Sequence, residues 1–319
     1  MNERIKRLLR QSFFFISSCI FGRCMIYCMQ NAKEFCEHQR YYQKGNHKMK
    51  LTYFGTAAAE GFPAVFCNCD YCKEARLLGG KNIRTRSQAL IDDTLLIDLC
   101  ADTYWHLMAN GVQGHQIKNL LVTHPHGDHF YPAELEMHQS PFAHEMKSPF
   151  LEVYGGKEVC ETIESCGRLR RIRAHHLTPF VPTTVGDYTV TALPARHMEE
   201  AEAFIYIIEG DSVLLYAHDT GYFYEETLRY IREKGLRFDL ISFDCTNVDI
   251  AVSDRGGHMG LDNIRRLDKV LEEMGAVDKK TVKIINHFSH NARPIQSVLE
   301  EKVKDDGYLV AFDGMQVTF

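Results

Sequence analysis

The chain gathers metal-ligand side chains in one short loop. Residues 123–129 read Thr-His-Pro-His-Gly-Asp-His, which places His124, His126, Asp128 and His129 within six residues. Imidazole nitrogens and carboxylate oxygens are ligands that Zn, Mn and Fe dications share. One tight loop can serve two ions if His124 and His126 point one way while Asp128 and His129 turn toward a neighbouring site. The loop therefore predicts a dinuclear metal centre.

Polar side chains also follow several apolar runs that read as buried strands. The runs and the residues after them are 117–122 with His124, 188–193 with His197, 212–216 with Asp219, and 281–285 with His287. Buried strands hold the backbone rigid, and the loops beyond them aim the side chains. We therefore expect these residues to converge on the rim of one active site.

Three of the 11 cysteines, Cys67, Cys69 and Cys72, are packed into six residues. This spacing allows three thiolates to bind one tetrahedral zinc, and a fourth ligand is missing from the local sequence. An odd number of cysteines in a long chain argues against a secreted disulfide framework. The cluster therefore indicates metal binding in a reducing compartment, and we expect a cytoplasmic protein.

A glycine-flanked histidine stands just before a predicted helix. Residues 256–260 read Gly-Gly-His-Met-Gly, and the apolar spacing that follows predicts a helix over 261–274. Free backbone N–H groups and the helix dipole favour negative charge at a helix N-terminus. His258 is therefore well placed to meet an anion, with a capping or packing role as the alternative.

The body of the chain repeats strand, turn and helix without a linker or low-complexity tract. The predicted strands are 50–55, 87–91, 94–99, 117–122, 188–193, 212–216, 238–243 and 281–285, and the predicted helices are 225–234 and 261–274. Asp92-Asp93 joins the second and third strands as a hairpin. We expect one α/β domain over residues 49–319.

Charge divides the chain near Met49. Residues 1–48 carry a net charge of +6 and the remainder carries −11. An acidic body repels polyanions, which argues against extended nucleic acid as a partner. The apolar run after Phe13 is broken by Ser17, Ser18 and Arg23, and falls short of the roughly 18 apolar residues of a membrane span. We expect residues 1–48 to form a basic, poorly ordered extension, and we expect no membrane contact.

The His-x-His-x-Asp-His loop after a buried strand resembles the metallo-β-lactamase superfamily. The resemblance continues in order through Ala195-Arg196-His197, Ala217-His218-Asp219-Thr220-Gly221 and Asn286-His287-Phe288-Ser289. It implies an α/β fold in the form of a four-layer αββα sandwich. It also implies the metal ligands: His124, His126 and His197 for one ion, Asp128, His129 and His287 for the other, and Asp219 as the bridge. Two close dications do require such a bridging carboxylate.

Within the superfamily, the cysteine cluster resembles the phosphoribosyl 1,2-cyclic phosphate phosphodiesterase family. That resemblance implies a structural zinc held by Cys67, Cys69, Cys72 and His290. It implies that His258 contacts the phosphate and can protonate the leaving group, and Asp128 is a second candidate catalytic residue that can orient the nucleophile. The implied function is hydrolysis of small cyclic or nucleotide-like phosphodiesters by a metal-bridging hydroxide, with two divalent ions, Zn or Mn, in the active site. We consider a homodimer as the assembly.

Two other interpretations share some of these motifs. An RNA-processing endonuclease of the tRNA 3′-processing type has a similar His-x-His-Gly-Asp-His loop, Gly-His-Met and His-Phe-Ser, but the acidic body and the cysteine cluster argue against it. A cofactor-biosynthesis protein resembling pyrroloquinoline-quinone synthesis protein B has similar Gly61-Phe62-Pro63 and Arg84-Thr85-Arg86-Ser87 segments. That family, however, lacks the full dinuclear histidine set.

Overall fold

The computed structural model describes residues 48–319, which form one compact unit from Lys48 to Phe319. The extension predicted for residues 1–48 lies outside the described residues, apart from Lys48. Among the helices of residues 48–319, none is long and apolar enough to cross a bilayer.

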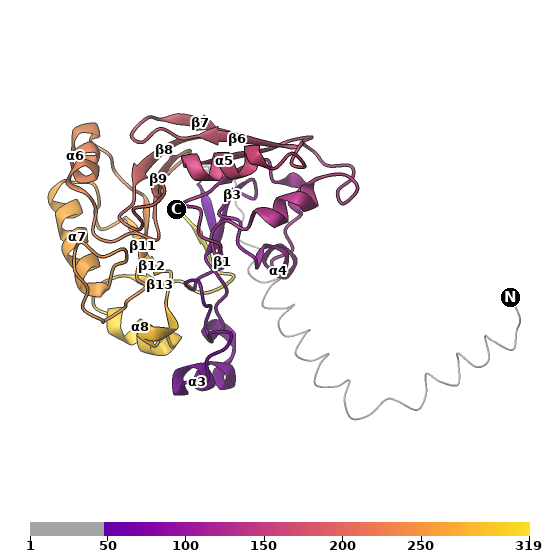
Figure 1. Ribbon diagram of the computed structural model, residues 1–319. Helices are drawn as coiled ribbons and strands as arrows, with labels where there is room; N and C mark the ends of the chain where they lie inside the picture. The colour runs from indigo at the N-terminus through magenta and orange to yellow at the C-terminus, as the bar shows by residue number, and fades with distance from the viewer. Residues whose placement is uncertain (1–47) are drawn as a thin grey trace, which may run out of the picture. The chain divides into compact units, whose positions relative to one another are not determined.

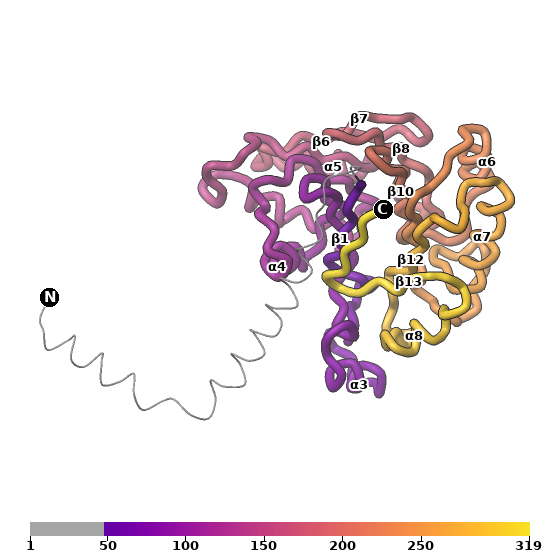
Figure 2. The backbone as a smooth tube through the Cα atoms, turned by 180° about the vertical axis from the view of Figure 1, so that it is seen from behind, coloured from indigo at the N-terminus to yellow at the C-terminus, as the bar shows by residue number. Residues whose placement is uncertain are grey.

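The unit is built on two seven-stranded mixed sheets (Figure 1). The first sheet has the order β14-β1-β2-β3-β4-β5-β6. Its strands are β1 Lys50–Gly55, β2 Gln88–Ile91, β3 Leu95–Ile97, β4 Asn119–Leu121, β5 Leu151–Gly155, β6 Ile172–His176 and β14 Gln316–Thr318. β3 to β6 run parallel, whereas β14, β1, β2 and β3 pair antiparallel. The pairing of β14 with β1 brings the C-terminus beside β1 (Figure 2).

The second sheet has the order β13-β12-β11-β10-β9-β8-β7. Its strands are β7 Thr183–Val185, β8 Tyr188–Pro194, β9 Phe204–Glu209, β10 Val213–Ala217, β11 Leu240–Asp244, β12 Val282–Asn286 and β13 Leu309–Val310. β7 to β10 form an antiparallel meander, and β10 to β13 run parallel. Ligands collect beyond the carboxyl ends of parallel strands in α/β folds, and this is where the site lies.

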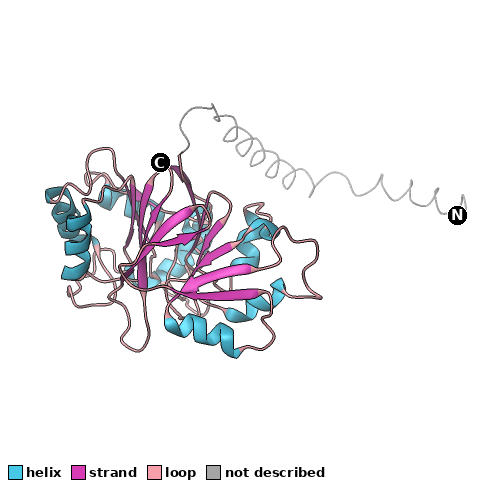
Figure 3. Ribbon diagram, turned by 90° about the horizontal axis from the view of Figure 1, so that it is seen from above, coloured by secondary structure: helices cyan, strands magenta, loops and turns pink. Residues whose placement is uncertain are grey.

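Helices cover the outer face of each sheet (Figure 3). The α-helices are α3 Asp70–Leu78, α4 Thr103–Ala109, α5 Lys157–Ser165, α6 Glu225–Lys234, α7 Leu261–Glu273 and α8 Gln296–Val303. The 3-10 turns are η1 Gly80–Asn82, η2 Gly114–Gln116, η3 Pro132–His138 and η4 His290–Ala292.

The hydrophobic core has three main layers, which is what a four-layer sandwich requires. Between the sheets, Tyr53 and Leu121 of the first sheet belong to the same buried cluster as Tyr206 and Leu214 of the second. A second cluster joins the first sheet to α5, and a third joins the second sheet to α6, α7 and α8. The predicted α/β sandwich of four layers is therefore confirmed.

Every strand and helix predicted from the sequence is present, with bounds shifted by up to two residues. Helix 225–234 ends as predicted at Gly235, whose φ of 59° is a left-handed cap that favours glycine. The hairpin between β2 and β3 turns at Asp92 and Asp93, which have φ values of 46° and 61°. Positive φ at both central residues is typical of the turn that matches the twist of antiparallel strands.

Candidate metal centre

Three histidines converge from two loops to form the first set of ligands. Nδ1 of His126 lies 2.9 Å from Nε2 of His124 and 3.0 Å from Nε2 of His197. His124 follows β4 and His197 follows β8, so that each sheet contributes to the set. Burial holds the pKa of both His124 and His197 below its ordinary value. Both imidazoles are therefore neutral, which is the form that binds a metal.

A second set lies around Asp219. Oδ2 of Asp219 is 2.6 Å from Nε2 of His129 and 3.1 Å from Nε2 of His287. All three side chains are buried, and within residues 48–319 these three atoms have no hydrogen-bond partner beyond one another. Buried polar atoms are normally satisfied, so three ligand atoms that meet only one another are suited to share a cation. This donor set fits a divalent ion.

Asp219 also faces the first set, as a bridging carboxylate must. Its Oδ1 atom is 3.9 Å from Nε2 of His197, on the other side of the carboxylate from His129. Burial opposes ionisation of Asp219, but the charges of His287 and His129 outweigh it and hold the pKa well below its usual range. The predicted bridging position is thus compatible with the geometry.

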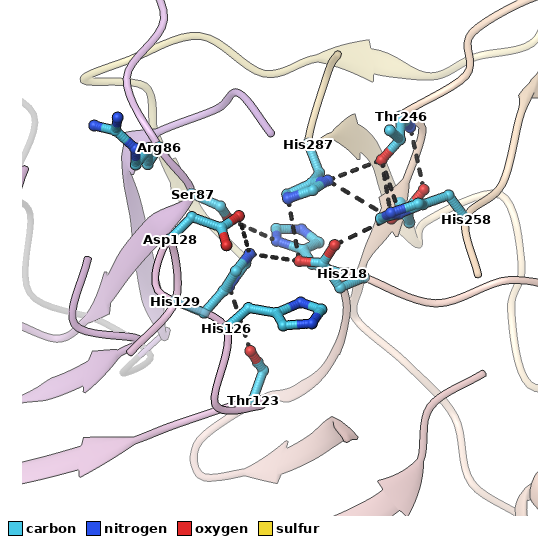
Figure 4. A network of polar contacts seen from close by, with 12 residues as sticks. Arg86, Ser87, Thr123, His126, Asp128, His129, His218, Thr246, His258 and His287 are labelled. Atoms are coloured by element: carbon cyan, nitrogen blue, oxygen red, sulfur yellow. Dashed lines mark hydrogen bonds and ion pairs between the residues drawn. The ribbon is translucent and has the colours of Figure 1, made fainter. Parts of the chain in front are cut away.

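Asp128 lies at the edge of the second set (Figure 4). Its Oδ2 atom is 3.3 Å from Nε2 of His129. Burial opposes its charge, yet the His129 contact lowers the pKa of Asp128 below its usual range. Asp128 is therefore an ionised carboxylate that can either bind the second ion or orient a nucleophile.

Unusual backbone geometry aims two of the ligands. Asp219 and His287 have φ values of 50° and 63°, in the left-handed region that few residues other than glycine adopt. Such conformations cost of order 1–3 kcal/mol and persist where the surrounding structure imposes them. Just after Asp219, a Cβ on Gly221 would lie 1.8 Å from the carbonyl oxygen of Gly256. Only glycine at 221 lets the loop before His258 pack this closely on the Asp219 turn.

Three residues that the sequence analysis did not single out orient the histidines. Asp98 accepts a hydrogen bond from Nδ1 of His129 at 2.7 Å, and Thr246 Oγ1 lies 2.8 Å from Nδ1 of His287. These contacts engage the Nδ1 atoms and leave Nε2 free for a metal. The third residue, Asp244, lies 3.0 Å from Nδ1 of His258. Asp98 follows β3 and Asp244 is the last residue of β11, so the strand-end pattern that marked Asp219 could have found them.

The candidate acid His258 is held by a fully buried carboxylate. Its Nδ1 atom is 3.0 Å from Oδ2 of Asp244, 3.2 Å from Oγ1 of Thr246 and 3.5 Å from Oδ1 of Asp219. Burial opposes a positive charge on His258, but Asp244, with a smaller contribution from Asp219, raises its pKa to about 9. The structure therefore places the His258 imidazole against the metal-ligand cluster (Figure 4), where the carboxylates favour its protonated form.

His218, which could be read as either a supporting or a core residue, is fully buried beside the ligands. Its Nε2 atom is 2.7 Å from Oγ of Ser242, and Nδ1 is 3.4 Å from Oγ of Ser87. Burial holds its pKa well below the ordinary value. His218 is a neutral side chain that ties the first sheet to the second beneath the site.

The cysteine cluster closes with the predicted histidine. One ligand atom from each of Cys67, Cys69, Cys72 and His290 lies within 4.8 Å of all the others. A hydrogen bond from the Cys72 backbone N–H lowers the pKa of the Cys69 thiol to about 6, whereas burial raises the pKa of Cys72 to about 11. Three sulfurs and one imidazole form a complete donor set for a tetrahedral zinc.

Two curated ribonuclease Z proteins are similar to part of this chain. The protein of Leuconostoc mesenteroides is 26% identical over 172 residues, which cover 51% of this chain and 49% of that protein. The protein of Picosynechococcus is 25% identical over 158 residues, or 47% and 44% of the two chains. The chain thus spans about half the length of the curated relatives it matches.

Several solved structures share the fold. A diphosphatase from the PhnP family has a TM-score of 0.65 at 18% identity, over 86% of this chain and 98% of that one. Zn²⁺-bound PqqB from Methylobacterium extorquens has a TM-score of 0.66 at 16% identity, over 85% and 100%. The short form of human tRNase Z has a TM-score of 0.55 at 16% identity, over 84% and 98%.

A family model matches the part of the chain that carries most of the site. The model describes the beta-lactamase superfamily domain and matches residues 94–288, from the start of β3 to the His287 loop. The match covers more than half of the chain and includes every ligand of the two sets around Asp219. Together with the two helix-covered sheets, it shows that this protein belongs to the beta-lactamase superfamily and has the metallo-β-lactamase fold.

Proposed function

We propose that this protein is a metal-dependent phosphodiesterase that hydrolyses small cyclic or nucleotide-like phosphodiesters. The observation that carries the proposal is the pairing of two features in one place. Buried ligand atoms of His129, Asp219 and His287 face one another, and the imidazole of His258 lies 3.5 Å from the Asp219 carboxylate. A cationic centre with an acid at its edge suits attack on an anionic ester whose leaving group needs a proton.

The donor sets divide between two ions. In this proposal His124, His126 and His197 would hold one ion, Asp128, His129 and His287 would hold the other, and Asp219 would be shared between them. Two divalent ions, when bound there, supply Lewis acidity, activation of water and neutralisation of the charge that develops on phosphate oxygens. Zn and Mn both suit these ligands. Cys67, Cys69, Cys72 and His290 would hold a separate structural zinc.

Side chains of the protein orient the metal ligands, donate the proton and position the water. Asp98 and Thr246 hold the rings of His129 and His287 with Nε2 directed to the centre. Asp244 engages Nδ1 of His258, which leaves Nε2 as the ring nitrogen that can donate. His258 then protonates the departing alkoxide, and Asp128, besides its place as a metal ligand, can accept a hydrogen bond from the attacking water and orient it.

A test of the proposal measures turnover and metal content together. Purified protein loaded with Mn, Zn or Fe is assayed against bis-p-nitrophenyl phosphate and a panel of cyclic phosphodiesters. We expect turnover with at least one metal, and a loss of about 10³-fold or more in Asp219→Asn, because one charge that neutralises the centre is gone. Asp187→Asn, a change on an exposed turn, serves as the control. Absence of turnover for every ester and metal would refute the proposal.

An RNA-processing endonuclease is the second candidate, because the curated relatives are ribonuclease Z proteins. The net charge of −11 on residues 49–319 argues against this candidate, because an acidic surface repels RNA. Cleavage of a precursor tRNA with a kcat/KM well above that of every small ester would favour this candidate. PqqB shares the fold of this chain, which keeps a PqqB-like function as an alternative. The complete set of metal-ligand side chains in this chain favours hydrolysis over that alternative.

We also propose a cellular compartment, the partners and an assembly for the enzyme. The cysteines within residues 48–319 are free thiols, as a reducing compartment favours. We propose a cytoplasmic enzyme, without extended nucleic acid or membrane as a partner, and a homodimer as its assembly. Sedimentation of the purified protein tests the dimer.

A further inference from the structure

The segment 288–290 joins the two groups of metal-ligand side chains, because His287 precedes it and His290 ends it. Each of its three backbone N–H groups donates to a separate part of the chain. The acceptors are the carbonyl of Thr56 at 2.9 Å, the carbonyl of Thr246 at 3.2 Å and Oε1 of Glu60 at 3.0 Å. Of these three acceptors, only Glu60 acts through its side chain.

Glu60 holds this segment through two contacts with one carboxylate oxygen. Its Oε1 atom accepts hydrogen bonds from Oγ of Ser289 at 2.7 Å and from the backbone N–H of His290 at 3.0 Å. Oγ of Ser289 in turn accepts a hydrogen bond from the N–H of Asn291 at 3.2 Å, which begins the η4 turn. A carboxylate is a stronger hydrogen-bond acceptor than a neutral oxygen. Glu60 therefore fixes both the side chain of Ser289 and the backbone of His290.

The chain runs from Glu60 into the cysteine cluster. Phe62 pairs with Arg84 through two backbone hydrogen bonds of 2.8 and 2.6 Å, and its ring belongs to the same buried cluster as Cys72. Sγ of Cys72 lies 3.7 Å from Nδ1 of His290. Glu60 is thus placed between the two parts of this donor set, because it contacts the histidine and precedes the cysteines along an anchored segment.

The segment 288–290 also continues a ligand of the dinuclear centre. The carbonyl of Phe288 accepts a hydrogen bond from the N–H of Ala58 at 3.0 Å, so the residue after His287 is tied to the stretch that leads into Glu60. Thr246, whose carbonyl binds the N–H of Ser289, places its Oγ1 atom 2.8 Å from Nδ1 of His287. The left-handed backbone of His287, with a φ of 63°, needs this support from its surroundings.

We propose that Glu60 is a positioning residue that couples the cysteine cluster to the dinuclear centre. It holds Ser289 and His290 so that His290 faces the cysteines while His287 faces Asp219. Zinc bound by the cluster would fix the same segment at His290, and would thereby raise the metal affinity of the centre. The inference rests on the metal sites of the proposed function and does not depend on which ester is hydrolysed.

The test measures metal binding at the two sites separately. Protein prepared with one zinc per chain, which the thiolates favour, is titrated with Mn²⁺, and the free Mn²⁺ is followed by electron paramagnetic resonance. Cobalt in place of that zinc gives a thiolate charge-transfer absorption, and its loss to a chelator reports on the cluster alone. We expect Glu60→Ala to bind Mn²⁺ about 10-fold more weakly and to lose cobalt at an about 10-fold lower chelator concentration.

Two further variants define the role of the carboxylate. Glu60→Gln keeps an oxygen that can accept both hydrogen bonds, so its two metal affinities should lie close to those of the wild type. Glu74→Ala removes an exposed carboxylate on α3, close in sequence to the same cysteines, and is the matched control. It should bind Mn²⁺ and cobalt like the wild type. Wild-type affinities at both sites in Glu60→Ala would overturn the inference.

A double-variant comparison separates coupling from a loss of stability. Cys69→Ser breaks the cluster and should lower the Mn²⁺ affinity about 10-fold in the wild-type background, but leave it unchanged in Glu60→Ala, where the connection is already lost. Effects that multiply in the double variant would mean that the sites are independent, and would overturn the coupling. Mn²⁺ titration of metal-free and one-zinc protein, with Glu60 and with Glu60→Ala, makes the same comparison without a substitution in the cluster.

The outcomes also separate the inference from the proposed function. If the wild-type protein holds both metals but hydrolyses no ester, the proposed function fails, and the Glu60 comparison still decides the inference. If esters are hydrolysed and Glu60→Ala binds both metals like the wild type, the coupling is wrong while the phosphodiesterase stands. A wild-type cluster that binds neither zinc nor cobalt would also overturn the coupling.

Discussion

Oδ2 of Asp98 lies 2.7 Å from Nδ1 of His129, and both side chains are fully buried. Asp98 also accepts hydrogen bonds from the backbone N–H and the hydroxyl of Thr123, at 2.8 and 2.9 Å. The carboxylate therefore fixes the ring of His129 and the start of the histidine loop at once. Burial opposes a positive charge on His129, but Asp219 and Asp98 outweigh it and raise its pKa well above the ordinary value. Asp98 and Asp219 together therefore favour positive charge at the position of His129.

Loss of the Asp98 carboxylate should weaken metal binding. Asp98→Asn keeps the size of the side chain but removes the charge that orients His129, so the affinity for the active-site metal should fall about 10-fold to 100-fold. Competition with a chelator measures the affinity. Asp93→Asn, which removes a carboxylate that is 62% exposed, is the control and should bind metal like the wild type. Equal affinities in the two variants would contradict a role for Asp98 in ligand orientation.

The pH dependence of kcat should report on His258. Its acid form has a pKa of about 9, so activity should fall as the pH rises through that value. Asp244→Asn removes the charge that raises this pKa, and the alkaline limb of the profile should then move to lower pH. An unchanged limb in Asp244→Asn would show that another group donates the proton.

The nature of the leaving group provides a separate check on His258. His258→Ala should slow esters with poor leaving groups by about 10²-fold to 10⁴-fold. The p-nitrophenyl ester should be slowed much less, because its leaving group departs without a proton. Equal losses on both esters would indicate that His258 binds substrate and does not act as the acid.

The cysteine cluster should contribute a metal ion beyond those of the active site. Cys69→Ser should lose one zinc and unfold at a lower temperature, because a structural zinc contributes directly to folding. Elemental analysis and thermal unfolding measure the two effects. Cys166→Ser removes a thiol outside the cluster and is the matched control. Equal metal content in wild type and Cys69→Ser would exclude the zinc.

Asp313 should make stability fall as the pH rises toward neutrality. Its carboxylate accepts hydrogen bonds from Thr56 and Thr85, and burial raises its pKa from 3.8 to about 6. The folded state therefore binds the proton more tightly than the unfolded state, so this contribution is complete below about pH 4 and is lost by about pH 6. The difference corresponds to roughly 3 kcal/mol.

Asp313→Asn should remove that slope, since an amide does not ionise. Urea unfolding at pH 4.5 and pH 7 measures the free energies for both proteins. The difference between the two pH values should be smaller in the variant than in the wild type. A wild-type slope retained in Asp313→Asn would assign the titration to other groups.

The sequence by itself determined the local features of this protein. Helix 225–234 and the strand over 50–55 are predicted by apolar periodicity and by the glycines at their ends. Both signals depend only on neighbours along the chain. The loop from His124 to His129 is visible for the same reason, because its ligand types lie within six residues. His290 was reached only through resemblance, since 218 positions separate it from Cys72.

Only the tertiary structure decided which side chains meet. Asp98 contacts His129 across 31 positions, and Arg293 lies over Tyr71 from a distant segment. Nothing in the periodicity of a strand says which partner its terminal carboxylate will face. That choice depends on how two sheets pack, and on left-handed backbone at Asp219 and His287 that the surrounding structure imposes. The ligand types are therefore set by the local sequence, whereas their orientation arises from contacts between distant parts of the chain.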